Sequence, residues 1–116
     1  MRVLAIFDDL LLGSNVLGML RAAGHEVQLV SGAAAHPDGA DVLVVDLTAG
    51  SFDGVGLVER LRADGELGDT RTLGVYSHVD AAARERAVEA GFDLVVPRSR
   101  MAREGPALVA RLADPG

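Results

Sequence analysis

The sequence has no cysteine, no lysine and no tryptophan, and aromatic residues make up only 3% of its 116 positions. Without cysteine it can form neither disulfides nor thiolate metal sites, and it has no cysteine nucleophile. All 11 basic residues are arginines, so the chain offers no Schiff-base amine and no ammonium point charge. Long apolar runs are also missing, and stretches such as 42–45 are far too short to span a membrane. We therefore expect a soluble, cytoplasmic protein.

The chain nevertheless contains enough apolar residues to build a core. Hydrophobic residues account for 49% of it, and 116 residues suit one domain rather than two. We expect a single domain over residues 1–116, with an ordered core over about 1–112. The net charge of −6 argues against direct binding to nucleic acid, because the phosphate backbone repels an acidic domain.

Short apolar segments alternate with helical patterns along the chain. Strands are predicted at residues 2–7, 26–30, 41–46, 73–77 and 94–96, where consecutive apolar positions are typical of parallel strands buried on both faces. Helices are predicted at residues 12–23, 55–63 and 80–90, each followed within two positions by a glycine.

Two further segments give weaker signals. The segment 31–40 leaves room for only one or two helical turns, so the second crossover helix is expected to be short. Pro106 fits the first turn of a final helix. The whole order predicts an α/β fold: a doubly wound, five-stranded parallel sheet in the order 2-1-3-4-5, forming a flavodoxin-like three-layer sandwich.

Polar side chains follow the carboxyl ends of four predicted strands. Asp8 and Asp9 follow the first strand, Asp46 ends the third, Ser77 ends the fourth and Arg98 follows the fifth. In an open parallel sheet these ends meet at one edge, where ligands bind. Three carboxylates in one place need a cation or a bound proton, and hard oxygen ligands favour magnesium. The residues alone predict a magnesium-dependent phosphoryl site with one carboxylate as acceptor.

Simpler structural interpretations stand beside this one. Asp8 and Asp9 suit the capping of a helix, and Asp46 suits the beginning of a turn. Ser77 can satisfy backbone groups of its own loop, and Arg98 can pair with nearby acids.

Four segments carry a family resemblance: Phe7-Asp8-Asp9-Leu10, Val44-Val45-Asp46-Leu47, Ser51-Phe52-Asp53-Gly54 and Glu89-Ala90-Gly91-Phe92-Asp93. They are similar to the acidic pair after the first strand, the phosphoacceptor segment, the loop after it and the approach to the fifth strand in receiver domains. Over nearly its whole length, the sequence resembles the receiver domain of bacterial response regulators.

The resemblance implies a receiver-like fold and a set of roles. Asp46 would accept phosphate from a histidine kinase, which would be the protein partner. Asp8, Asp9 and Asp46 would hold magnesium with the backbone carbonyl of Thr48. Ser77 would hydrogen-bond the phosphoryl oxygens.

The sequence departs from the receiver pattern at several positions. Arg98 stands where receivers have lysine, and a planar guanidinium is a poor substitute for a compact ammonium. Ser99 replaces a proline, Val95 replaces the aromatic switch residue and Ala49-Gly50 replaces methionine-proline. An ion pair between Arg98 and Asp46 would either imitate the missing lysine or close the site.

Three functional hypotheses remain open. The first is a stand-alone receiver-like signalling domain, not an enzyme, that acts through protein contacts on its last strands and helices. The second is a degenerate pseudo-receiver that serves as a phosphorylation-independent interaction or homodimerisation module. The third is a small metal-dependent phosphatase that uses the same acids.

Overall fold

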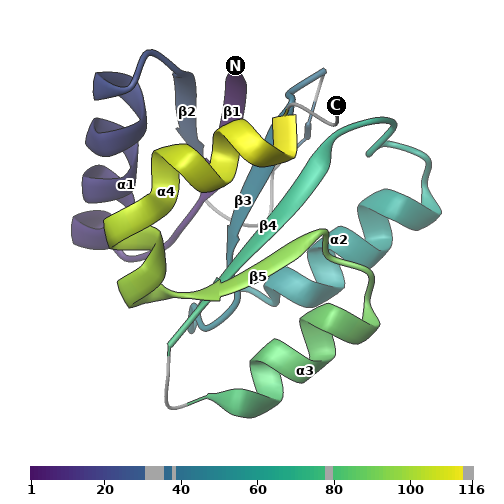
Figure 1. The fold of residues 1–116 in the computed structure, drawn as a ribbon. Coiled ribbons are helices and arrows are strands. Elements are labelled where there is room, and N and C mark those ends of the chain that lie inside the picture. Colours follow the sequence, from purple (N-terminus) through teal and green to yellow (C-terminus); the bar gives the residue numbers. More distant parts are fainter. Residues whose placement is uncertain (31–35, 38, 78–79, 114–116) are drawn as a thin grey trace.

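The computed structural model describes residues 1–30, 36–37, 39–77 and 80–113. Its centre is a sheet of five parallel strands in the order β2-β1-β3-β4-β5 (Figure 1). The strands are β1 (Arg2–Ile6), β2 (Glu26–Val30), β3 (Val42–Asp46), β4 (Arg71–Tyr76) and β5 (Leu94–Pro97). This confirms the predicted strand order, with boundaries shifted by one or two residues.

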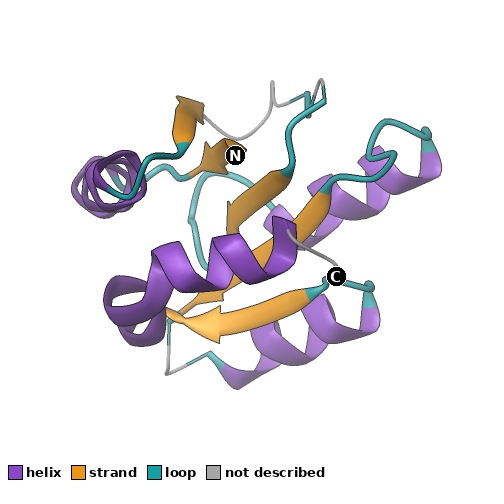
Figure 2. Cartoon of the chain, turned by 45° about the horizontal axis from the view of Figure 1, so that its top comes forward, coloured by secondary structure: helices purple, strands orange, loops and turns teal. Residues whose placement is uncertain are grey.

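In the described part of the chain four helices cover the two faces of the sheet, and Figure 2 shows the three layers. They are α1 (Leu10–Ala22), α2 (Gly54–Ala63), α3 (Ala81–Glu89) and α4 (Arg98–Ala113). One core cluster joins the sheet to α1 and α4, and a second joins its other face to α2 and α3. The predicted doubly wound α/β architecture is confirmed.

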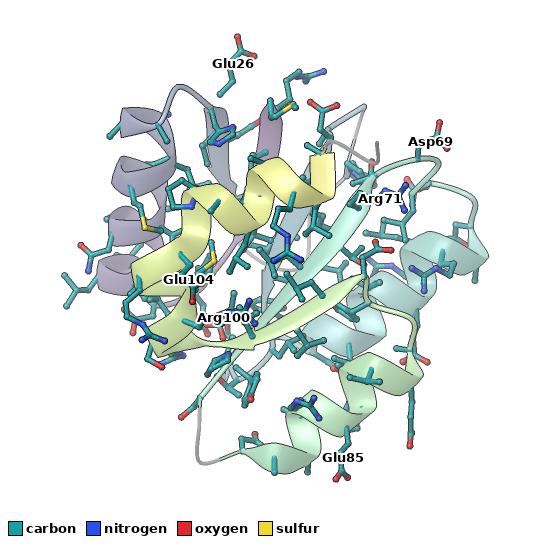
Figure 3. All side chains as sticks on the ribbon, in the orientation of Figure 1. Glu26, Asp69, Arg71, Glu85, Arg100 and Glu104 are labelled. Carbon is teal, nitrogen blue, oxygen red and sulfur yellow. The ribbon has the colours of Figure 1, made fainter. Side chains whose placement is uncertain are left out.

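Burial along the strands explains why this order is stable. All five residues of β3 are buried, and successive side chains belong to opposite core clusters, as the pleat of a strand requires. The edge strand β2 instead alternates, because Val27 is buried whereas Glu26 and Gln28 are exposed. Figure 3 shows Glu26 extending away from the body of the molecule, as Glu85 on α3 does. Polar edge positions of this kind discourage pairing with another sheet.

Local signals set the helix ends. Asp9, Asp53 and Asp80 each cap the helix that follows, since the side chain of each accepts hydrogen bonds from backbone amides of the first turn. Glycines with positive φ follow the first three helices: Gly24, Gly65 and Gly91.

The prediction for the last helix was wrong. Pro106 lies inside α4 rather than in its first turn, because α4 begins at Arg98, directly after β5. A proline there removes one helical hydrogen bond, at a cost of about 3 kcal/mol. The helix continues because Met101, Leu108 and Val109 on both sides of the proline are buried in the core.

The prediction of a short second crossover helix falls on residues 31–35 and 38, which lie outside the described residues. Nearby, the amide of Ala40 donates to the carbonyl of Pro37, and Gly39 has a positive φ. None of the helices in the described part of the chain has the length and apolar character that crossing a membrane requires.

Candidate functional site

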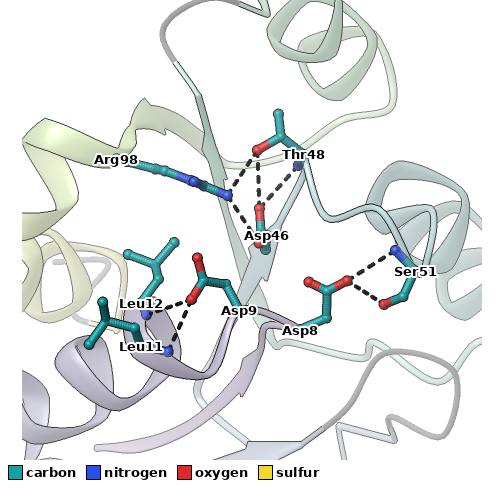
Figure 4. A network of polar contacts seen from close by, with 8 residues as sticks. All are labelled: Asp8, Asp9, Leu11, Leu12, Asp46, Thr48, Ser51 and Arg98. Carbon is teal, nitrogen blue, oxygen red and sulfur yellow. Dashed lines mark hydrogen bonds and ion pairs between the residues drawn. The ribbon is translucent and has the colours of Figure 1, made fainter.

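The carboxyl ends of the central strands bring four of the predicted side chains to one edge of the sheet (Figure 4). Asp8 and Asp9 follow β1, and Asp46 is the last residue of the neighbouring β3. Arg98, the first residue of α4, reaches this edge from the end of β5. The arrangement follows from the parallel order of the strands.

Asp46 is the most enclosed of these groups, with 0% of its surface exposed. Its Oδ1 accepts a hydrogen bond from the Thr48 amide at 3.1 Å and another from the Thr48 hydroxyl at 3.3 Å. Its Oδ2 lies 3.5 Å from Nη2 of Arg98, forming an ion pair. A buried carboxylate of this kind needs such partners, because an unpaired charge away from water is strongly destabilising.

Arg98 joins Asp46 and Thr48 into one network. Its Nη2 also donates to the Thr48 hydroxyl at 3.4 Å, and 37% of its side chain is exposed. Two atoms of the pair are nevertheless buried without a hydrogen-bond partner among the described residues: Oδ2 of Asp46 and Nε of Arg98. The contact between Asp46 and Arg98 is therefore an ion pair without a hydrogen bond between the two side chains, and the hydrogen bond of Arg98 goes to Thr48.

Asp9 serves the fold of α1. Its Oδ1 accepts hydrogen bonds from the amides of Leu11 at 3.0 Å and Leu12 at 3.1 Å. This is the ordinary role of an aspartate at a helix N-terminus, and it fixes the carboxylate against the helix.

Asp8 is held by a residue that the sequence argument did not single out for the site. Its Oδ2 accepts hydrogen bonds from the amide of Ser51, at 3.0 Å, and from the Ser51 hydroxyl. Figure 4 shows Asp8 turned toward Ser51 and Asp9 toward α1. The two partners are 43 positions apart, so no local pattern in the sequence could have indicated this contact.

The resemblance of the sequence to receiver domains implies a magnesium ion at this edge, and the side chains do not fit one in this arrangement. Within the described ranges, no three acidic or histidine side chains form a group that could hold a metal ion. Asp8 is bound by Ser51, Asp9 caps α1 and Asp46 is paired with Arg98. Metal binding by these acids stays a prediction.

The two remaining predicted residues have different positions. Thr48 lies beside Asp46, but it makes its contacts through its amide and hydroxyl groups. Ser77 follows β4 directly and is half-buried, and its carbonyl accepts a hydrogen bond from the Asp80 amide at 2.9 Å. Between these described residues, the Ser77 hydroxyl makes no hydrogen bond to Asp46.

Comparison with solved structures shows which known proteins share this architecture. A response regulator receiver domain protein from Clostridium thermocellum matches with a TM-score of 0.82 and 15% identity, covering 97% of this chain and 93% of that one. The chain has the receiver fold. The non-phosphorylated HemR receiver domain from Leptospira biflexa matches with a TM-score of 0.78 and 22% identity, over 97% and 94% of the two chains. The chemotaxis response regulator CheY4 of Vibrio cholerae matches with a TM-score of 0.78 and 18% identity, over 96% and 97%.

No protein-family model matches the sequence, and no curated protein matches it either. At these low identities the structural likeness shows the fold alone. What the receiver fold does in this chain must therefore be argued from the residues at the edge of the sheet.

Proposed function

We propose that this protein is a signalling domain of the receiver type that acts through protein contacts and does so without phosphorylation. The proposal depends on one observation: Asp46 is fully buried and forms an ion pair with Arg98. The second of the three sequence hypotheses, a pseudo-receiver, is therefore the one that the geometry supports best.

The chemistry of phosphorylation explains why this observation matters. A carboxylate oxygen of Asp46 would have to attack the phosphorus of a donor in line with the bond that breaks to the leaving group. Here Oδ1 accepts two hydrogen bonds from Thr48, and Oδ2 faces Arg98. A donor can reach Oδ2 only if Arg98 withdraws and leaves a buried charge behind, which is costly.

A protein-binding role is supported by apolar surface next to this edge. Leu10 and Leu11, in the first turn of α1, are 76% and 75% exposed. They adjoin Asp8 and Asp9, so apolar and acidic groups lie side by side. Exposed apolar side chains with a charged rim are typical of a contact surface, and here they suit a partner that presents apolar and basic groups.

The proposal is tested by offering the protein a phosphoryl donor. We expect acetyl phosphate or beryllofluoride with magnesium to leave the intact mass and the amide NMR spectrum unchanged. A partner captured from cells should bind the Asp46→Asn variant as tightly as the native protein, and self-association measured by sedimentation should be equally unaffected. A phosphoryl adduct that disappears in Asp46→Asn, with altered partner affinity, would overturn the proposal.

A second candidate is the phosphorelay function, in which Asp46 accepts phosphate from a histidine kinase with magnesium. One observation favours it: Oδ2 of Asp46 and Nε of Arg98 lack hydrogen-bond partners among the described residues, so the pair is not fully satisfied. Opening it would free an acceptor oxygen. The same donor experiment decides, because this candidate expects a mass increase of one phosphoryl group on Asp46.

A further inference from the structure

The charges at the edge of the sheet are unequal. Among the described residues, the carboxylates of Asp8, Asp9 and Asp46 lie there, and the ion pairs include one guanidinium, that of Arg98 with Asp46. Asp8 and Asp9 are exposed to water, which screens their charge, whereas Asp46 is fully buried. Asp46 is therefore the carboxylate that most needs a partner of opposite charge, and Arg98 supplies one at Oδ2.

We infer that Arg98 is the built-in counter-cation of Asp46 and takes the electrical role that a divalent ion would otherwise have at this edge. Ser51 completes the arrangement by holding Asp8 away from Asp46. The inference rests on the proposed function and deepens it, because it names the residues that make this site independent of metal.

The position of Arg98 suits this role. It lies at the junction of β5 and α4, so the backbone at both sides is held by regular structure. A guanidinium is more weakly hydrated than an ammonium, which favours it in a partly buried pair. A divalent ion at Oδ2 would meet the positive charge of Nη2 only 3.5 Å from that oxygen.

Ser51 holds the carboxylate of Asp8, the second carboxylate that a divalent ion at this edge would need. Its amide and hydroxyl both donate to Oδ2 of Asp8. Swinging Asp8 toward Asp46 would break both hydrogen bonds. Replacing Ser51 by alanine removes the hydroxyl contact and keeps the backbone amide. It therefore lowers the cost of moving Asp8 toward Asp46 without altering the charge of the protein.

The inference is tested by thermal unfolding of four proteins in EDTA and in saturating magnesium. The four are the native chain, Arg98→Met, Arg98→Met with Ser51→Ala, and the control Arg100→Met. Arg100 is on the same helix and pairs with Glu104 (Figure 3), whereas Asp46 pairs with Arg98, so the control removes the same charge without removing the partner of Asp46.

We expect the native chain and Arg100→Met to unfold at the same temperature with and without magnesium. Arg98→Met in EDTA should unfold about 10 °C lower, because it leaves Asp46 buried and unpaired. Magnesium at about ten times its dissociation constant should then raise the unfolding temperature of Arg98→Met by about 5 °C, and that of the double variant by more. If Arg98→Met is unfolded in EDTA, the same readout is recovery of the folded far-ultraviolet spectrum on adding magnesium.

A magnesium response of the native chain would overturn the inference, and so would its absence in both variants that carry Arg98→Met. These outcomes are separate from those of the phosphoryl-donor experiment. If the Arg98→Met variants gain no metal site, the proposed function still stands. If Asp46 becomes phosphorylated, the proposed function is contradicted, whether or not magnesium changes the unfolding temperature.

Discussion

The ion pair between Asp46 and Arg98 allows a quantitative prediction about stability. Its atoms are 3.5 Å apart, and the gross attraction at an effective dielectric constant of 20 is about 5 kcal/mol. Burying both groups offsets much of this, but the 37% exposure of Arg98 reduces the desolvation cost on its side. We expect a net coupling free energy of about 2 kcal/mol between the two side chains.

A double-mutant cycle with Asp46→Asn and Arg98→Met measures this coupling. Arg98→Met should lower the free energy of unfolding by about 2–3 kcal/mol, since it strands a buried carboxylate. Asp46→Asn should cost about 1 kcal/mol, because its amide oxygen can still accept hydrogen bonds from Thr48. The loss of unfolding free energy in the double variant should therefore be about 2 kcal/mol smaller than the sum of the two single losses.

Urea unfolding followed by circular dichroism gives the four free energies, provided that all four proteins show the same dependence on urea concentration. Single effects that add within about 0.5 kcal/mol would refute the reasoning, because they would show that the two charges do not depend on one another.

Three further predictions concern the scaffold. Asp9→Ala should destabilise the protein by about 1 kcal/mol in urea unfolding, whereas Asp9→Asn should not, because asparagine also caps helices. Gly54→Ala should cost about 1–3 kcal/mol of stability and lower the unfolding temperature, because its new Cβ would lie 2.8 Å from a carbonyl oxygen of β3. Gly50→Ala is the control, because a Cβ at Gly50 would have no atom within 4 Å. Equal effects of the two substitutions would show that the close contact at Gly54 is not the cause. Thr72→Val should cost about 1–2 kcal/mol, because the buried hydroxyl exchanges hydrogen bonds with Asp93; an unchanged urea midpoint would show that those bonds contribute nothing.

Much of the fold could be predicted because its signals are local. Apolar runs over consecutive positions indicated buried parallel strands, and the strict alternation with helices then allowed few sheet orders. Asp80 and Gly91 marked the two ends of α3 correctly. Pro106 misled the prediction for α4, because burial of apolar residues on both sides of the proline outweighs its local preference for a first turn.

The site was predictable only in outline. Acids at the ends of β1 and β3 had to reach the same edge, because parallel strands end on the same side of a sheet. The sequence had indicated a helix cap for Asp9 and a pairing of Arg98 with Asp46, and the structure shows both. The contact of Asp8 with Ser51 could not be read from the sequence, because the two residues lie far apart along the chain. Ser51 binds Asp8 across 43 positions, and Arg98 approaches Asp46 from the start of α4, which follows β5 directly.

The sequence by itself determined the order of strands and helices, the acidic net charge and the kinds of side chain at the functional edge, since these depend on periodicity, composition and strand ends. The tertiary structure alone decided that Asp46 is fully enclosed and that Asp8 is bound by Ser51. The physical reason is that burial and contacts between distant residues are properties of packed neighbours.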